Sequence, residues 1–266
     1  MVMLFVLALP AWSQTQRYAV PAASVADDFA AYRQALDSAA DSAVTNMMRE
    51  PATTSQIVEG GAKTTPLPAA NVLHRFAAQY WNGNDEAVRR AVARVMELRP
   101  VLALILQEEG VPSEIAALVL VESGGQPTAL SPRGARGLWQ FMPDTARRFG
   151  LTINSETDDR MDIPKSTRAA ARYLRELHVQ FGDWSLALAA YNAGEIAVRN
   201  AVSRSGSRDF AVLSSKRFIP AETRAYVPAV MAASPWFTGN SVFGSDAAQM
   251  HWMPTISYAS SAAGDQ

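Results

Sequence analysis

Helical periodicity is the feature that most constrains the fold of this chain. From about residue 71 to residue 235, apolar residues recur three and four positions apart, while the alternation typical of strands is scarce. Pro100 should kink or divide the first long helix, Gly110 should close it, and Ser113 should cap the next. We expect helices between residue 86 and Gly110 and over 114–122, 143–149, 164–181, 183–192, 195–204 and 222–233. The sequence therefore predicts an all-α domain of short and medium helices.

The segments on either side of this domain have different patterns. With 266 residues, one main domain with extensions is expected rather than two equal domains. Residues 14–70 form an N-terminal extension, in which 25–50 has helical spacing that includes Tyr32, and the rest contains prolines and glycines. We expect the helical domain over 71–235 and a C-terminal tail over 236–266 that has aromatic residues but little periodicity.

The first thirteen residues are typical of the apolar part of a signal peptide. Residues 1–12 are apolar, and Ala11 and Ser13 are small, so we expect cleavage after Ser13, although the usual positive start is missing. The stretch is too short for an ordinary membrane span, and the alternative is a buried N-terminal helix. The chain has no cysteine, so disulfides, thiolate metal sites and a cysteine-linked lipid anchor are excluded. We therefore expect a soluble protein after cleavage.

Charge and motif content exclude several classes of function. The 24 basic and 25 acidic residues give a net charge of −1, which offers no indication of a nucleic-acid partner. The three histidines are isolated and share no ligand spacing, so no metal site is expected. There is also no glycine-rich phosphate loop and no G-x-S-x-G motif, and we expect no cofactor. The sequence does not indicate protein partners or oligomeric state.

Glu122 is the first candidate for chemistry. In the helix predicted over 114–122, it lies on the same face as Ile115, Leu118 and Val119 by three- and four-residue spacing. A carboxylate that extends an apolar stripe loses hydration, which should raise its pKa and suit it to general acid catalysis. The alternative is a glutamate at a helix end that reaches water. A loop rich in glycine, proline and serine follows at once.

Two later segments carry polar groups that could serve the same site. In SPRGARGLWQFMP, glycines allow close approach of a ligand, and Ser131 and Gln140 offer hydrogen-bonding groups. Trp139 could offer a flat surface to a sugar ring, or it could pack in the core. In AYNAG, Tyr191 and Asn192 stand at the end of an apolar helix, and the alternative is a core tyrosine with a capping asparagine.

Four ordered motifs together resemble those of lytic transglycosylases. They are the pair Glu122-Ser123, GLWQFMP at 137–143, AYNAG at 190–194 and IPAETRAYVPAVMA at 219–232. The resemblance covers about residues 90–235 and is nearest to the membrane-bound lytic murein transglycosylase D group of glycoside hydrolase family 23, which is related to goose-type lysozyme. It implies a lysozyme-like, all-α fold carrying the SLT domain, preceded here by the helical extension.

The resemblance also implies an activity and a location. Such enzymes cleave the bond between N-acetylmuramic acid and N-acetylglucosamine in the glycan strands of peptidoglycan without adding water, and they leave a 1,6-anhydromuramoyl end. Glu122 would be the single acid and base, with the substrate's N-acetyl group acting as the nucleophile. A periplasmic or secreted location would follow. The chain departs from the group in having no cysteine for a lipid anchor and no recognisable C-terminal sugar-binding repeat.

Roles for other residues follow from the same resemblance. Ser131 and Gln140 would hydrogen-bond the substrate, Met142 would line the site, and Tyr191 would orient Glu122 or the N-acetyl group. Asn192 would support the loop at Tyr191. The glutamate of the ETR motif, Glu222, would lie near the sugar-binding site, and Ser123 would cap the local backbone.

Two other functions stay open at this point. A hydrolytic muramidase or chitinase on the same fold would require a second carboxylate. The candidates are Asp158, Asp159 and Asp162, although acids at a helix start usually serve the helix dipole. A non-catalytic protein that binds the cell wall is the third possibility, and the presence of Glu122 argues against it.

Overall fold

The computed structural model describes residues 30–32, 34, 86–234 and 237, and over these residues the chain is helical. In this part the extended pairing is limited to isolated bridges in two loops. The elements are α3 (Glu86–Glu108), η1 (Ser113–Ala116), α4 (Ala117–Ser123), α5 (Pro143–Arg148), η2 (Asp159–Met161), α6 (Ile163–Phe181), α7 (Trp184–Ala193), α8 (Glu195–Ser205), α9 (Phe210–Ser215) and α10 (Ala221–Ala233). The predicted all-α class is therefore confirmed.

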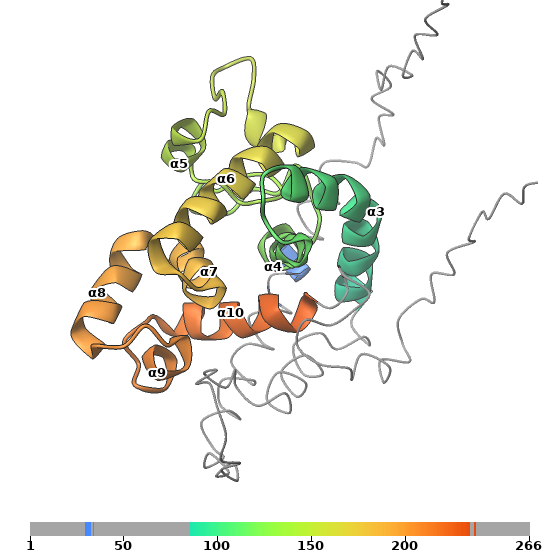
Figure 1. The fold of residues 1–266 in the computed structure, drawn as a ribbon. Coiled ribbons are helices and arrows are strands. Elements are labelled where there is room, and N and C mark those ends of the chain that lie inside the picture. Colours follow the sequence, from blue (N-terminus) through green and yellow to red (C-terminus); the bar gives the residue numbers. More distant parts are fainter. Residues whose placement is uncertain (1–29, 33, 35–85, 235–236, 238–266) are drawn as a thin grey trace, which may run out of the picture.

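Helix α4 lies at the centre of this arrangement. It appears nearly end-on in Figure 1, with α3, α6, α7 and α10 around it, and it packs directly against α3 and α10. Residues 117–121 and Ser123 are all buried, and only Glu122 is half-buried. The predicted apolar residues Ile115, Leu118 and Val119 are buried, but so are the other positions of this central helix, so the stripe alone does not distinguish the side of Glu122. Glu122 lies where this covering is incomplete.

Local signals placed most helix ends correctly. Helix α6 begins after Asp162, whose carboxylate accepts from the backbone N–H of Lys165, and it ends at Gly182 in a left-handed conformation. Helix α7 begins in the same way after Asp183. At each of these ends a side chain or a glycine satisfies backbone groups that the helix leaves open.

Three details of the predicted helices differ from the structure. Helix α3 runs unbroken through Pro100, so the proline does not divide it; the loss of one backbone bond is outweighed by the helix's buried apolar face. Ser113 starts a short 3₁₀ helix and makes no cap, since its hydroxyl contacts the neighbouring Glu114 instead. Helix α9, which is capped by Asp209, was not predicted because six residues are too few to display a period.

Of the residues that the structure describes outside the continuous stretch 86–234, two belong to the core. Tyr32 is fully buried and packs in the same hydrophobic cluster as α3 and α4, and Phe237 is buried as well. The predicted signal peptide (1–13), the linker and most of the extension and tail lie outside the described residues. None of the described helices combines the length and the apolar composition that crossing a membrane requires.

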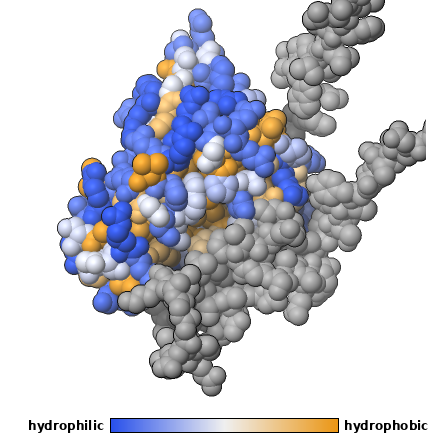
Figure 2. Space-filling view, viewed as in Figure 1, coloured by the Kyte–Doolittle hydropathy of each residue, from blue (hydrophilic) through white to orange (hydrophobic). Residues whose placement is uncertain are grey.

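The surface is mostly hydrophilic on the face drawn in Figure 2, and apolar residues form small separate patches on it. Among the described residues, five large apolar side chains are exposed: Leu104, Leu130, Met142, Val179 and Ile196. Two of them, Leu130 and Met142, border the loop that follows α4.

Candidate active site

Glu122 faces a tyrosine from the last helix. The hydroxyl of Tyr226, on α10, donates to Oε1 of Glu122 over 2.6 Å. Tyr226 itself is buried, and Glu122 is half-buried at the end of α4. A hydrogen bond of this kind orients the carboxyl group. It joins residues 104 positions apart in the sequence.

Tyr191 lies within electrostatic reach of the same carboxylate. Burial, first, and the negative charge of Glu122, second, raise the pKa of Tyr191 well above its ordinary value. Its hydroxyl donates to the backbone carbonyl of Trp139 over 2.7 Å, so Tyr191 joins α7 to the loop before α5. The predicted proximity of Tyr191 to Glu122 therefore has support, but in the structure it is Tyr226 that donates to the glutamate.

Gln140 holds together the loop between α4 and α5. Its amide nitrogen donates to the carbonyls of Ala129, at 3.2 Å, and Gly137, at 2.9 Å, and its own backbone has a φ of +48°. Neither bond uses Oε1 of Gln140. Ser131 also acts within the loop, since its hydroxyl accepts from the backbone N–H of Ala135 over 3.0 Å. Both predicted substrate-binding residues thus shape the loop on which they lie.

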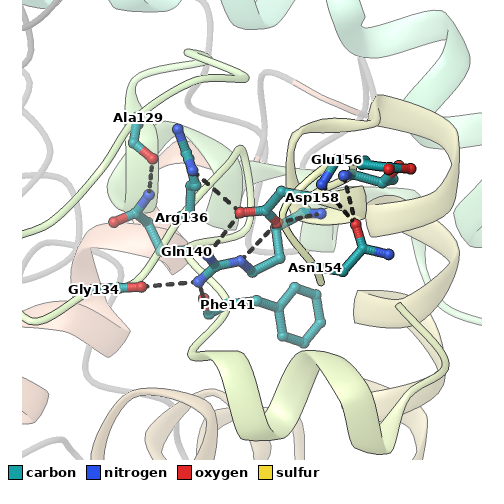
Figure 3. A network of polar contacts seen from close by, with 10 residues as sticks. Ala129, Gly134, Arg136, Gln140, Phe141, Asn154, Glu156 and Asp158 are labelled. Carbon is teal, nitrogen blue, oxygen red and sulfur yellow. Dashed lines mark hydrogen bonds and ion pairs between the residues drawn. The ribbon is translucent and has the colours of Figure 1, made fainter. Parts of the chain in front are cut away.

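Arg160, which lies in η2, holds this loop through its guanidinium group. Figure 3 shows the network of polar contacts to which Gly134, Phe141 and Asp158 belong. Its Nη1 donates to the carbonyl of Gly134 at 2.9 Å and to that of Phe141 at 3.1 Å. Its Nε and Nη2 form a two-point contact with the carboxylate of Asp158 at 2.9 and 2.8 Å, which Arg136 also approaches at 3.3 Å. One buried guanidinium therefore holds the loop at two places, Gly134 and Phe141.

Gly137 is required where the loop passes Arg160. Its φ of +84° is in the region that favours glycine, and a Cβ placed there would lie 1.8 Å from the carbonyl oxygen of Arg160. The next residue but one, Trp139, is fully buried, and its indole N–H donates to the hydroxyl of Thr167 over 3.0 Å. The idea that Trp139 presents a surface to a sugar ring is therefore wrong, because the ring belongs to the core.

The remaining predicted residues lie around this centre in different ways. Met142, which precedes α5, is exposed and can line an open site. Asn192 accepts from the hydroxyl of Thr223 over 2.7 Å, so it links the end of α7 to α10. Glu222 is exposed in the first turn of α10, one helical turn before Tyr226. Ser123 is buried and donates to the carbonyl of Val119, four residues back.

The three aspartates that could supply a second carboxylate are all held by neighbouring groups. Hydrogen bonds from Arg160 lower the pKa of Asp158. The ammonium of Lys165, at 2.8 Å, lowers that of Asp159, which is buried. Asp162 caps α6. These contacts match the roles of acids at turns and helix starts, as the sequence pattern suggested.

Tyr226 is the site residue that sequence reasoning missed. It lies within the quoted motif ETRAYV, four positions after Glu222, and so on the same side of the helix. The spacing alone could not select it, because the same motif also offered a glutamate and an arginine.

Comparison with known proteins agrees with this geometry. Residues 101–214 match the family described as the transglycosylase SLT domain. Membrane-bound lytic murein transglycosylase D of Escherichia coli K12 is 37% identical over 144 residues, which are 52% of this chain and 31% of that protein. Soluble lytic murein transglycosylase of the same strain is 33% identical over 126 residues, covering 46% of this chain and 20% of that protein. The chain thus spans about a third or less of the length of these relatives.

Solved structures show the same fold. The 70-kDa soluble lytic transglycosylase from Escherichia coli has a TM-score of 0.50 and 22% identity, and the match covers 66% of this chain and 35% of that one. A complex of the 70-kDa soluble lytic transglycosylase with bulgecin A has a TM-score of 0.50 and 26% identity, over 66% of this chain and 32% of that one. The resemblance drawn from the sequence motifs is confirmed over residues 101–214, which match the transglycosylase SLT domain family.

Proposed function

We propose that this chain is a peptidoglycan lytic transglycosylase that uses Glu122 as its single general acid and base. The observation that carries the proposal is the half-buried position of Glu122 at the end of the central helix of an SLT domain, where Tyr226 orients its carboxyl group. The engagement of Asp158, Asp159 and Asp162 by neighbouring groups supports a mechanism without a second carboxylate.

In the first step, the protonated carboxyl group of Glu122 gives its proton to the glycosidic oxygen as the bond from that oxygen to C1 of N-acetylmuramic acid breaks. The carbonyl oxygen of the substrate's own N-acetyl group attacks C1 and takes the place of a protein nucleophile. In the second step, the carboxylate of Glu122 removes the proton from the C6 hydroxyl, whose oxygen attacks C1 and releases the N-acetyl group. The proton balance closes on Glu122, and a 1,6-anhydromuramoyl end results.

The neighbouring residues have roles that fit this scheme. Tyr226 orients the carboxyl group of Glu122 for proton transfer. Gln140 and Ser131 hold the loop beside the site and offer polar atoms to the sugar, and Met142 offers an apolar edge. We assign Tyr191 to the N-acetyl side of the site and Asn192, through Thr223, to the support of α7 against α10. Glu222 is exposed, and we place it near the sugar-binding site.

Digestion of purified peptidoglycan, followed by mass spectrometry of the muropeptides, tests the proposal. Wild-type protein should release products with anhydromuramoyl ends, each lighter by one water than its hydrolytic counterpart. Glu122→Gln keeps the shape but removes the acid and base, and should lower the rate by about 10²- to 10⁴-fold. The exposed Glu156→Gln is the matched control and should leave the rate unchanged. Products with ordinary reducing ends would instead identify a hydrolytic muramidase and refute the proposal.

Tyr226→Phe tests the orientation of Glu122 separately. Loss of the hydroxyl removes one hydrogen bond to a charged group, so we expect kcat to fall by about 10- to 100-fold with the fold intact. Bulgecin A, the ligand in the complex of the similar soluble transglycosylase, provides a probe that does not depend on turnover. We expect it to bind wild type and Glu122→Gln in calorimetry, and absence of binding to both would argue against a transglycosylase groove.

The proposed substrate places the protein in the cell envelope. Peptidoglycan strands are its expected partner, and a periplasmic or secreted location follows if residues 1–13 act as a signal peptide. Fractionation of cells that produce the full chain, with detection by antibody, would test this location directly.

A further inference from the structure

Tyr32 is a core residue of the helical domain, although in the sequence it lies far before the residues that match the SLT family. It is fully buried, whereas Ala30, Ala31 and Gln34 in the same helical stretch are exposed. The SLT match begins at residue 101. Among the described residues of the N-terminal extension, Tyr32 therefore enters the interior, and the question is what it contacts there.

Both ends of the Tyr32 side chain contact the last turn of α4. Its hydroxyl donates to the backbone carbonyl of Leu120, which also accepts the N–H of Gly124. Its ring lies against Gly124, where any Cβ would come within 3.0 Å of the ring and 3.1 Å of the side chain of Ala91. Gly124 and Tyr32 are thus complementary, because the missing side chain makes room for the ring. Figure 1 shows residues 30–32 and 34 in blue beside α4.

The two contacts lie on either side of Glu122 in the sequence. Leu120 precedes it by two residues and Gly124 follows it by two. In an α-helix two residues correspond to a rotation of about 200°, so Leu120 and Glu122 lie on opposite sides of α4. Tyr226 of α10 donates to the carboxyl group of Glu122. Tyr32 donates to the backbone of the same turn, at Leu120.

We propose that Tyr32 is a positioning residue for Glu122, so that the N-terminal extension is a working part of the catalytic unit. Its activity-related consequence rests on the function proposed above. Helix α4 has only seven residues and ends directly after Glu122, so its last turn depends on tertiary contacts for its order. The hydroxyl of Tyr32 is a second donor to the carbonyl of Leu120, in addition to the N–H of Gly124.

Tyr32→Phe tests the proposal with little change in packing, since the ring remains over Gly124. On purified peptidoglycan we expect kcat to fall by about 3- to 10-fold, which corresponds to one net hydrogen bond, while KM stays the same. Gln34→Ala, an exposed change in the same helical stretch, should alter neither constant. If the wild type yields anhydromuropeptides and Tyr32→Phe has the same kcat, the proposed role of Tyr32 in catalysis would be overturned, while its role in ordering the helix turn would not.

Hydrogen exchange of the full chain gives a readout that does not depend on activity. In Tyr32→Phe, the amide of Gly124, which donates to Leu120, should exchange about 3- to 10-fold faster, while amides of α8 keep their rates. Equal acceleration in α8 would mean general destabilisation and would overturn the proposal, as would unchanged exchange at Gly124. If wild type released no anhydromuropeptides, the proposed function would fail, and the exchange data would still decide whether Tyr32 holds this turn.

Discussion

Replacement of Arg160 by methionine should destabilise the protein more than any change at an exposed arginine. Methionine keeps much of the apolar stem but removes the guanidinium. The carbonyls of Gly134 and Phe141 then lose their donor, and Asp158 loses its two-point contact. The side chains of Arg160 and Asp158 are only 7% and 10% exposed, so water does not replace these bonds freely.

The size of the effect follows from the contacts that remain. Breaking a buried ion pair from one side typically costs about 3–5 kcal/mol, and each buried carbonyl left without a donor costs about 1–3 kcal/mol. Arg136 stays at 3.3 Å from Asp158, and its side chain is 34% exposed, so part of the charge remains compensated. The Gly134 contact is only partly buried, and the costs of groups that share one partner do not add in full. We therefore expect a loss of about 3–4 kcal/mol in the free energy of unfolding, at the low end of the cost of breaking the ion pair.

Urea unfolding followed by tryptophan fluorescence measures this loss. With a slope of about 2 kcal/mol per molar urea, the midpoint should fall by about 1.5–2 M. Arg147→Met is the matched control, because Arg147 pairs at 3.2 Å with Asp144 in a bridge whose side chains are 54% and 101% exposed. That change should cost less than about 0.5 kcal/mol. Equal midpoints for the two variants would refute the reasoning that Arg160 is the fixed point of the loop.

Two further predictions concern the same loop. Gly137→Ala should lower the free energy of unfolding by at least about 2 kcal/mol, because the position has a positive φ and the new Cβ would clash with Arg160. The control, Gly150→Ala, has a φ of +86° but open space around it, so it should lose only the stability that backbone strain costs. Equal melting temperatures of the two variants in calorimetry would contradict this. Acid should also destabilise the protein, because the pKa values of Asp158 and Asp159 are lowered on folding. Their contribution to the free energy of unfolding is complete above about pH 4 and is lost as the pH falls through the folded pKa values. Urea midpoints that do not decrease from pH 5 to 3 would contradict this linkage.

Most of the fold could be predicted because its helices carry their own end signals. Asp162, Asp183 and the glycines at 182 and 206 mark ends that depend on local hydrogen bonds, and the predicted bounds agree with the structure to within a residue or two. The sides of a helix are a different matter. The run ALVLV in α4 has no polar side, and periodicity cannot show which direction such a helix leaves open.

The partners of Glu122 could not be predicted from the sequence for a related reason. Tyr191 and Tyr226 both follow apolar residues on helices in recognisable motifs, and either could have reached the carboxylate. The choice depends on how α10 packs against α4 and α7, and so on contacts between residues about a hundred positions apart in the sequence. Tyr191 is directed instead to the carbonyl of Trp139, and burial of Trp139 fixes that carbonyl in place.

The structure sharpens the chemistry that Gln140 can offer a ligand. Its nitrogen donates to two backbone carbonyls, of Ala129 and Gly137, and carbonyls cannot accept from an amide oxygen, so the orientation of the side-chain amide is determined. What Gln140 has left is the acceptor Oε1. Such an atom can meet a sugar hydroxyl or the N–H of an N-acetyl group, but not a carbonyl. The sequence predicted that Gln140 makes a polar contact with a ligand. The loop geometry limits this predicted contact to a hydrogen bond that Oε1 accepts.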